Sequence, residues 1–292
     1  MRELYLKARA KVNLGLDVTG KREDGYHELR MIMQTVNLFD RIKLTATRTP
    51  GIRIQTNLRY LPVNETNLAY RAADLLAREF SIKEGIFIDL YKHIPVAAGL
   101  AGGSSDAAAV LRGMNTMFSL GLTQEELMER GVRLGADVPY CIAGGTALAE
   151  GIGEKLTRLK PPPACHVLLA KPDIHVSTKY VYTHLDLASV REHPPIDRQL
   201  AALEEGDLES LAACMGNVLE TVTVRAFPVI EEIRAAMLDG GALGAMMSGS
   251  GPTVFGLFEN EADAQKIADC LREKGSARQI YLTTWAEAEE SL

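Results

Sequence analysis

The chain has 292 residues, of which 47% are hydrophobic and 24% are charged, as in a globular protein with room for two domains. No apolar run is long enough to span a membrane and no signal-peptide pattern is visible, so we expect a cytoplasmic protein with no membrane partner. The formal net charge of −6 argues against a nucleic-acid partner. The four cysteines include no C-x-x-C pair, which favours free thiols over a zinc site.

The first part of the chain predicts mainly strands. Residues 8–18 alternate apolar and polar side chains, which indicates a half-buried strand with Lys11 and Asn13 on its polar face. Further strands are expected at 31–47, 51–56 and 86–91. The apolar spacing predicts helices at 68–80, 107–118 and 125–134, the last one ending at Gly135.

The second part mixes helices and strands after a linker at Pro161-Pro162-Pro163. Helices are expected at 200–205, 208–219, 229–237 and 262–274, and strands at 166–170, 253–258 and 279–285, with a glycine-rich hairpin around Ser250. Strict βαβ alternation is missing, so the pattern predicts an α+β fold. We expect two domains, residues 1–160 and 161–292.

The most informative segment is the glycine-rich stretch at 95–106. It contains three glycines and then two hydroxyls: Gly99, Gly102, Gly103, Ser104 and Ser105. Glycine permits positive φ and close approach of a ligand, and a helix start offers unpaired N–H groups, so the stretch predicts a phosphate-binding loop. Either serine suits the N-cap, and Asp106 suits the first turn. The alternative is a turn that only lets the helix pack closely.

The commoner phosphate loops are excluded. Ser104 follows Gly103 where a Walker A loop has lysine, and the stretch does not read G-x-G-x-x-G. The turn at 248–252 also lacks the third glycine of that pattern, and the chain contains no H-R-D or D-F-G tripeptide. A phosphate site at this loop would therefore belong to another phosphate-binding framework.

Together with Lys11 and Asp137, the loop resembles that of the galactokinase, homoserine kinase, mevalonate kinase and phosphomevalonate kinase (GHMP) superfamily. Five stretches carry the resemblance in the family's order: Ala10–Leu16, Asp24–Leu29, Pro95–Ala109, Gly135–Pro139 and Met247–Thr253. The first two are similar to members that phosphorylate the cytidine diphosphate ester of methylerythritol in the non-mevalonate isoprenoid route. One departure is Ala97-Ala98, where many members carry more glycine.

The resemblance implies an N-terminal domain like domain 2 of ribosomal protein S5, a C-terminal ferredoxin-like domain, and an active site in the cleft between them. It implies transfer of the γ-phosphoryl group of ATP, with Mg²⁺, to the 2-hydroxyl of the methylerythritol unit. The partner is then this small-molecule substrate, and we expect a monomer or a homodimer.

By motif position, the resemblance implies that Lys11 and Asp137 are the catalytic pair. It implies substrate contacts from Asn13, Tyr26, His27, Tyr182 and Asp137. For ATP it implies the loop and two outlying residues: Pro95, Val96, Ala97, Ala98, Gly99, Leu100, Ala101, Gly102, Gly103, Ser104, Ser105, Asn67 and Lys92. The metal ligands stay unassigned, although one of the two serines could help to hold Mg²⁺.

Alternatives remain open from the residues themselves. Lys11 could be an ordinary exposed lysine of a strand. Asp137 could be a helix-capping or turn aspartate, and Tyr182 could be a packing residue beside Val181. The chain could also be another kinase of the superfamily, acting on mevalonate, homoserine or a sugar. A non-catalytic nucleotide-binding regulator on the same fold is a further alternative.

Overall fold

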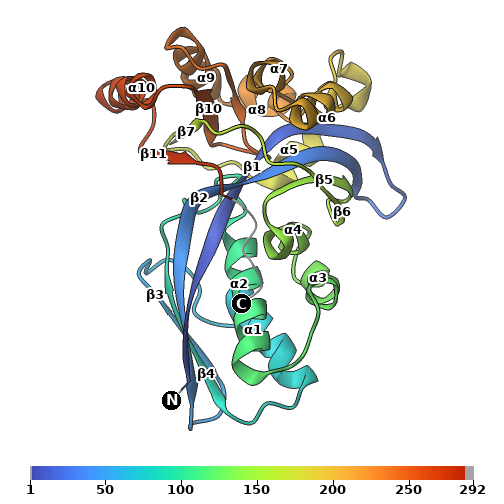
Figure 1. The fold of residues 1–292 in the computed structure, drawn as a ribbon, viewed down its shortest axis with the longest axis vertical. Helices are drawn as coiled ribbons and strands as arrows, with labels where there is room; N and C mark the ends of the chain where they lie inside the picture. Colours follow the sequence, from blue (N-terminus) through green and yellow to red (C-terminus); the bar gives the residue numbers. More distant parts are fainter. Residues whose placement is uncertain (1, 287–292) are drawn as a thin grey trace.

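The computed structural model describes residues 2–286 and contains two β-sheets flanked by helices (Figure 1). The strands of the first sheet are β1 (Glu3–Lys21), β2 (His27–Thr47), β3 (Ile52–Thr56), β4 (Gly85–Tyr91), β5 (Thr146–Gly151), β6 (Lys155–Arg158) and β8 (Gly216–Asn217). Its order is β3-β4-β2-β1-β8, with β5 beside β2 and β6 beside β5. The second sheet has the order β11-β7-β10-β9.

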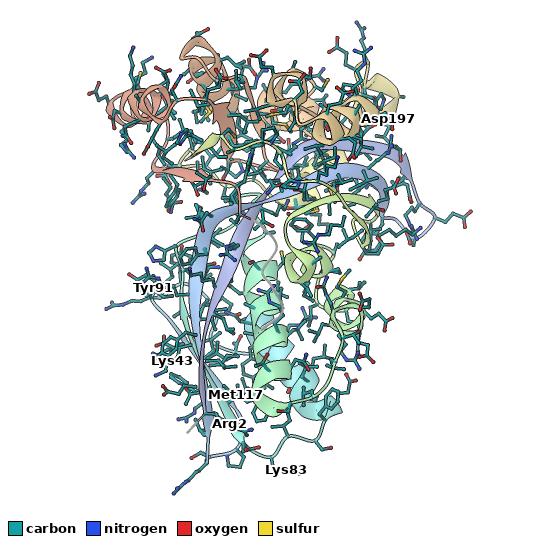
Figure 2. All side chains as sticks on the ribbon, viewed as in Figure 1. Arg2, Lys43, Lys83, Tyr91, Met117 and Asp197 are labelled. Carbon is teal, nitrogen blue, oxygen red and sulfur yellow. The ribbon has the colours of Figure 1, made fainter. Side chains whose placement is uncertain are left out.

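The helices of the first half are α1 (Leu68–Glu79), α2 (Gly102–Phe118), α3 (Gln124–Val132) and α4 (Val138–Ala143). α1 and α2 pack against one face of the first sheet, and their buried side chains share a core cluster with Leu6, Ile42 and Leu44. Lys43 and Tyr91 project from the opposite face of this sheet (Figure 2). The alternation of apolar and polar residues in these strands follows from having one face packed and the other exposed.

The long hairpin of β1 and β2 connects the two halves of the molecule. Its lower part packs on α1 and α2, whereas Leu16, Val18 and Met31 in its upper part share a core with residues from the second sheet. The prediction of a half-buried strand at 8–18 is wrong for the middle of β1, where Lys11 is 4% exposed and Asn13 is fully buried. Both faces are covered because elements from the two halves meet there.

Register shifts bend β1 where it passes from one half to the other. They fall between Arg9 and Lys11, between Asn13 and Gly15, and further along between Val18 and Gly20. Such bulges change which way the side chains face, and they leave Lys11 and Asn13 turned toward a cleft. A regular alternation read from the sequence contains no sign of them.

The second sheet lies under a layer of helices (Figure 1). Its elements are β7 (His166–Lys171), α9 (Val229–Asp239), β9 (Gly244–Met247), β10 (Val254–Phe258), α10 (Glu261–Glu273) and β11 (Gln279–Thr284). All of its strand pairs are antiparallel, and the β-α-β-β-α-β sequence with order β11-β7-β10-β9 is the ferredoxin-like arrangement. The predictions of a ferredoxin-like part and of an α+β fold are confirmed.

Between β7 and α9 lie α5 (Thr178–His184), α6 (Ile196–Glu205), α7 (Leu208–Ala213) and α8 (Glu220–Ala226), with a short 3₁₀ turn at Leu187–Ser189. The single helix predicted at 208–219 is wrong. It is interrupted after α7 because Gly216 and Asn217 pair with β1 as strand β8. The boundary at 160/161 stays a prediction: 161–163 joins the two sheets, but β8 belongs to the first sheet.

The carboxyl group of Glu220, the first residue of α8, is expected to make the free energy of unfolding depend on pH. Burial raises the pKa of its carboxyl group to about 7 from 4.5, although the bond from Met247 N (2.7 Å) opposes the shift. The pKa of Glu220 is higher in the folded protein than in the unfolded chain. The stabilisation of the folded state by the protonated carboxyl group is therefore complete below about pH 4.5 and is lost as the pH rises toward 7. Glu220→Gln keeps the acceptor without the charge, so we expect it to stabilise the protein at pH 8 by about 1–2 kcal/mol.

Urea denaturation at pH 5 and pH 8 measures this effect. The gain should shrink toward pH 5, and Glu259→Gln, at an exposed carboxylate, should show no such trend. A gain of equal size at both pH values would contradict the assignment.

Candidate active site

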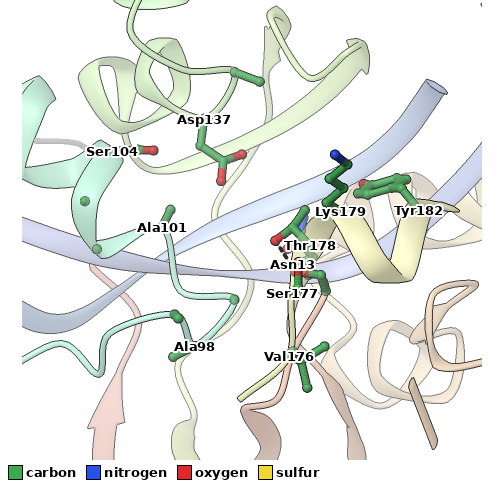
Figure 3. A pocket seen from close by; sticks show the side chains of 18 of the residues that line it. Asn13, Ala98, Ala101, Ser104, Asp137, Val176, Ser177, Thr178, Lys179 and Tyr182 are labelled. Atoms are coloured by element: carbon green, nitrogen blue, oxygen red, sulfur yellow. Dashed lines mark hydrogen bonds between the residues drawn. The ribbon is translucent and has the colours of Figure 1, made fainter. Parts of the chain in front are cut away.

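A cleft of about 1320 Å³ lies between the two halves. It is lined by the middle of β1, the turn before β2, the glycine-rich loop, the start of α4, α5 and the turn at 249–251 (Figure 3). Most of the residues predicted as site residues line it: Lys11, Asn13, Tyr26, His27, Asn67, Lys92, Pro95, Val96, Ala97, Ala98, Gly99, Ala101, Gly102, Gly103, Ser104, Asp137 and Tyr182. The tertiary structure therefore brings together residues from 11 to 182.

The backbone of the glycine-rich loop alternates in and out of the left-handed region. Ala97, Gly99 and Ala101 have φ values of 50°, 77° and 55°. Such alternation turns successive N–H groups toward one side and makes an anion-binding concavity. Of the three glycines in the loop, only Gly99 uses positive φ. Gly102 serves close packing instead, because a Cβ there would lie 3.3 Å from Lys92 Nζ.

The helix after the loop begins earlier than the sequence indicates. α2 starts at Gly102, its N-cap position is Ala101, and no side chain caps it, so the prediction of a serine N-cap is wrong. The first N–H groups of a helix lack intrahelical partners, and here they belong to residues that line the cleft. The N-terminus of a 17-residue helix thus faces the cleft, as phosphate binding requires.

Two residues of the predicted ATP set do not line the cleft. Leu100 is 1% exposed and belongs to a core cluster. Ser105 donates its hydroxyl to Arg9 O (2.6 Å) and its N–H to Ala101 O (2.8 Å), so neither donor is available to a ligand. Ser104 does line the cleft, and its hydroxyl points toward Asp137 in Figure 3. The helical turn separates neighbouring serines by about 100°, which explains why only one of them faces the cleft.

The turn at 248–251 is fixed against the loop. Ser248 Oγ donates to Gly99 O (3.0 Å), and a Cβ at Gly99 would lie 2.1 Å from Ser248 O. Asn217 of β8 donates to Met247 O (2.9 Å) and to Gly249 O (2.8 Å), which holds the turn from behind. Asn217 could not be recognised as a site residue from the sequence, because only the pairing of β8 with β1 brings it to this turn.

A connected group of polar side chains lines the cleft, formed by Lys11, Asn13 and Asp137. Lys11 Nζ donates to Asn13 Oδ1 (2.7 Å) and lies 3.9 Å from Asp137 Oδ2. Asp137 occupies the N-cap position of α4, but its side chain makes no capping bond and is 35% exposed. The capping alternative is therefore wrong for its side chain, and the exposed-lysine alternative is wrong for Lys11, which is 4% exposed.

A buried charged cluster lies under the loop and was missed in the sequence. Lys92 Nζ contacts carboxylates of Asp40 and of Asp106, the latter at 2.6 Å. Burial lowers the pKa of Lys92, but the two carboxylates outweigh it and the pKa is raised. Asp40 also accepts the N–H groups of His93 and Ile94, whereas Asp106 Oδ1 has no hydrogen-bond partner. Desolvation accordingly raises the pKa of Asp106 well above its usual range.

Asn67 has a structural role in addition to its place in the cleft. Its Oδ1 accepts from Ala69 N (2.9 Å) as the N-cap of α1, and its Nδ2 donates to Pro62 O (2.9 Å). Both polar ends of the side chain are therefore already bonded within the protein. Asn67 lines the cleft near the loop while fixing the start of α1.

Two aromatic side chains that line the cleft, His27 and Tyr182, lie against each other. The rings of His27 and Tyr182 are 5.1 Å apart at their centroids and tilted by 35°. Burial and then the charge of Lys21 lower the pKa of His27, which favours the neutral form of the ring. Tyr26 also lines the cleft and is 57% exposed. Tyr182 packs partly against the core, so both its packing role and its place in the cleft are real.

The chain matches two family descriptions, "GHMP kinases N terminal domain" over residues 67–145 and "GHMP kinases C terminal" over residues 199–277. It is 56% identical to the 4-diphosphocytidyl-2-C-methyl-D-erythritol kinase of Lachnospira eligens, covering 97% of this chain and 98% of that protein. It is 48% identical to the protein of the same name from Bacillus cereus, with 99% of each chain covered.

Solved structures agree with these relatives. A crystal structure of 4-(cytidine 5'-diphospho)-2C-methyl-D-erythritol kinase matches with a TM-score of 0.84 and 35% identity, covering 98% of this chain and 100% of that one. A homoserine kinase from Cytophaga hutchinsonii shares the fold, with a TM-score of 0.79, 21% identity, and coverage of 99% and 96%. The chain therefore belongs to the GHMP kinases and, within them, to the family of the 4-diphosphocytidyl-2-C-methyl-D-erythritol kinases.

Proposed function

We propose that this enzyme transfers the γ-phosphoryl group of ATP to the 2-hydroxyl of 4-diphosphocytidyl-2-C-methyl-D-erythritol in the non-mevalonate isoprenoid route. One observation carries the proposal: a single cleft holds a phosphate loop, a Lys11–Asp137 pair and an aromatic pair, His27 and Tyr182. The loop suits the triphosphate, the charged pair suits the reacting hydroxyl, and the aromatic rings suit the cytosine.

In the proposed reaction, Asp137 accepts the proton of the substrate's 2-hydroxyl group. The hydroxyl oxygen forms the new bond to the γ-phosphorus of ATP, and the bond from that phosphorus to ADP breaks. Lys11 is held by Asn13 and lies beside Asp137, so its ammonium group orients the carboxylate and stabilises negative charge on the transferred group. The N–H groups at the start of α2 face the phosphates. Most of the catalytic effect then comes from positioning and charge, as expected for a loose phosphoryl-transfer transition state.

We propose that Mg²⁺ accompanies ATP, where it would neutralise charge on the phosphate oxygens. The residues fit such an ion. Mg²⁺ prefers hard oxygen donors and often takes only one or two from the protein. Within the described part of the chain, Ser104 Oγ faces the cleft and makes no hydrogen bond, so this hydroxyl would hold the ion, while Ser105 is already engaged.

A substrate panel tests the function. ADP release should occur with the cytidine diphosphate ester of methylerythritol and not with free methylerythritol, mevalonate, homoserine or galactose. Turnover of one of the other alcohols would instead support a different GHMP kinase activity. ATP binding without turnover of any of them would support the regulator. We expect the enzyme to act in the cytoplasm, where ATP is available, as a monomer or a homodimer.

Tyr182→Ala is expected to raise KM for the cytidine ester about 10- to 100-fold and to leave KM for ATP nearly unchanged. The reason is the loss of one ring that stacks on the base, since such stacking contributes roughly 1–3 kcal/mol. Tyr182→Phe keeps the ring and should behave like the wild type. Tyr26→Ala, at a more exposed ring, should show the same selectivity with a smaller effect.

Steady-state kinetics with each substrate varied in turn measures both constants. An equal rise of the two KM values would show that the variant disturbs the whole cleft and would remove the cytidine role from these tyrosines.

A further inference from the structure

The charges that line the cleft are unevenly neutralised. Lys11 lies beside Asp137, and Lys92 is bonded to two carboxylates. Lys21 and Lys179 also line the cleft, but within the described part of the chain neither makes an ion pair or a side-chain hydrogen bond. The cleft therefore carries two cations whose charge is not compensated by the protein.

These two lysines belong to the elements that carry the aromatic pair. Lys21 is the last residue of β1 and is paired in register with His27 at the start of β2. Lys179 lies three residues before Tyr182 on α5, and this spacing puts both side chains on one face of the helix. In Figure 3 the Lys179 side chain enters the cleft beside Tyr182, with Asp137 across from it. One lysine thus accompanies each ring, Lys21 on the β1–β2 hairpin with His27 and Lys179 on α5 with Tyr182.

The remaining acid nearby does not compensate them. Asp186 lines the same cleft, but among the described residues it forms no ion pair with either lysine, and its Oδ1 accepts instead from Ala188 N (3.1 Å) as the cap of the 3₁₀ turn. Lys21 is close enough to His27 for its positive charge to act on that ring, after the larger effect of burial. Two uncompensated cations beside an aromatic pair form a site for an anion attached to a flat ring.

We propose that Lys21 and Lys179 form a diphosphate subsite that binds the pyrophosphoryl group between the base and the alcohol of the substrate. This inference rests on the proposed function, because the base must lie at His27 and Tyr182 for the diphosphate to pass between these lysines and the Lys11–Asp137 pair. Two cations match the two negative charges of a diphosphate diester. The subsite selects cytidine diphosphate compounds over monophosphate compounds and is separate from the loop that binds ATP.

Calorimetric titration with CDP, CMP and cytidine tests the subsite without turnover. The wild type should bind CDP at least about 10-fold more tightly than CMP, as expected when a second charged phosphate is bonded. Lys21→Met combined with Lys179→Met should remove most of this preference and leave the affinity for cytidine unchanged. Lys21→Arg combined with Lys179→Arg should restore it. Lys83→Met, at an exposed lysine far from the cleft (Figure 2), is the matched control and should behave like the wild type.

The outcomes separate the two proposals. If the wild type binds cytidine but gains nothing from the second phosphate, or if the double methionine variant keeps its CDP preference, the diphosphate subsite is wrong and the proposed function stands. If none of the three cytidine compounds binds, the assignment of the base to His27 and Tyr182 fails, and the subsite fails with it.

Discussion

Replacing Asp137 by asparagine is expected to lower kcat by about 10²- to 10⁴-fold, the range that a positioned general base contributes. Asparagine keeps the size of the side chain but cannot take the proton of the acceptor hydroxyl. The Asp137 side chain makes no capping bond to α4, so the substitution should not unfold the protein. Lys11→Met should lower kcat comparably, because Lys11 Nζ lies 3.9 Å from Asp137 Oδ2.

The measurement is steady-state kinetics together with ATP binding by titration. The asparagine variant should bind ATP with near wild-type affinity, since the substitution leaves the proposed phosphate-binding loop unchanged. Asp173→Asn, at an exposed carboxylate outside the cleft, serves as the control and should keep full activity. A kcat within a few-fold of the wild type for Asp137→Asn would remove this residue from the role of base.

The second large effect concerns stability. Lys92→Met is expected to lower the free energy of unfolding by about 3–5 kcal/mol, because it leaves two carboxylates buried without their cation. Asp106→Asn should cost much less, since it removes a carboxylate whose Oδ1 has no partner and whose ionisation is already disfavoured by burial. Asp40→Asn should lie nearer to Lys92→Met, because Asp40 also accepts two backbone N–H groups.

Urea denaturation of the three variants at pH 7 gives this order. If Asp106→Asn proved as destabilising as Lys92→Met, the two carboxylates would contribute equally, and the asymmetry in the structure would have no energetic meaning. The ATP affinity of Asp106→Asn is a second readout. We expect it to be retained, because asparagine can still accept the bond from Lys92 and so keep the ammonium group under Gly102.

Ala97 of the glycine-rich loop occupies a backbone position that favours glycine. This alanine adopts φ 50°, a left-handed conformation in which a Cβ is unfavourable by roughly 1–2 kcal/mol. The next residue, Ala98, is held at its carbonyl oxygen, which accepts a hydrogen bond from Thr253 N (3.4 Å). The loop keeps its shape here without a glycine.

Most helices and strands could be predicted because each depends on local periodicity. The strands at 51–56 and 86–91 and the helix at 68–80 agree with β3, β4 and α1 to within a residue or so. α4 was missed because it has six residues, too few to show a helical period. The start of α2 was misplaced because the serines that look like caps lie inside its first turn, after a left-handed Ala101 that no sequence rule requires.

By itself the sequence determined the α+β class and predicted a phosphate-binding loop and most of the residues that line the cleft, because these depend on periodicity, glycine chemistry and motif order. Only the tertiary structure decided which loop residues line the cleft, and that Ser105 and Leu100 do not. It alone revealed that Lys92 is neutralised by Asp40 and Asp106. The two ion pairs join residues as much as 52 positions apart, Asp40 and Lys92, and such pairings arise from packing rather than from any local pattern.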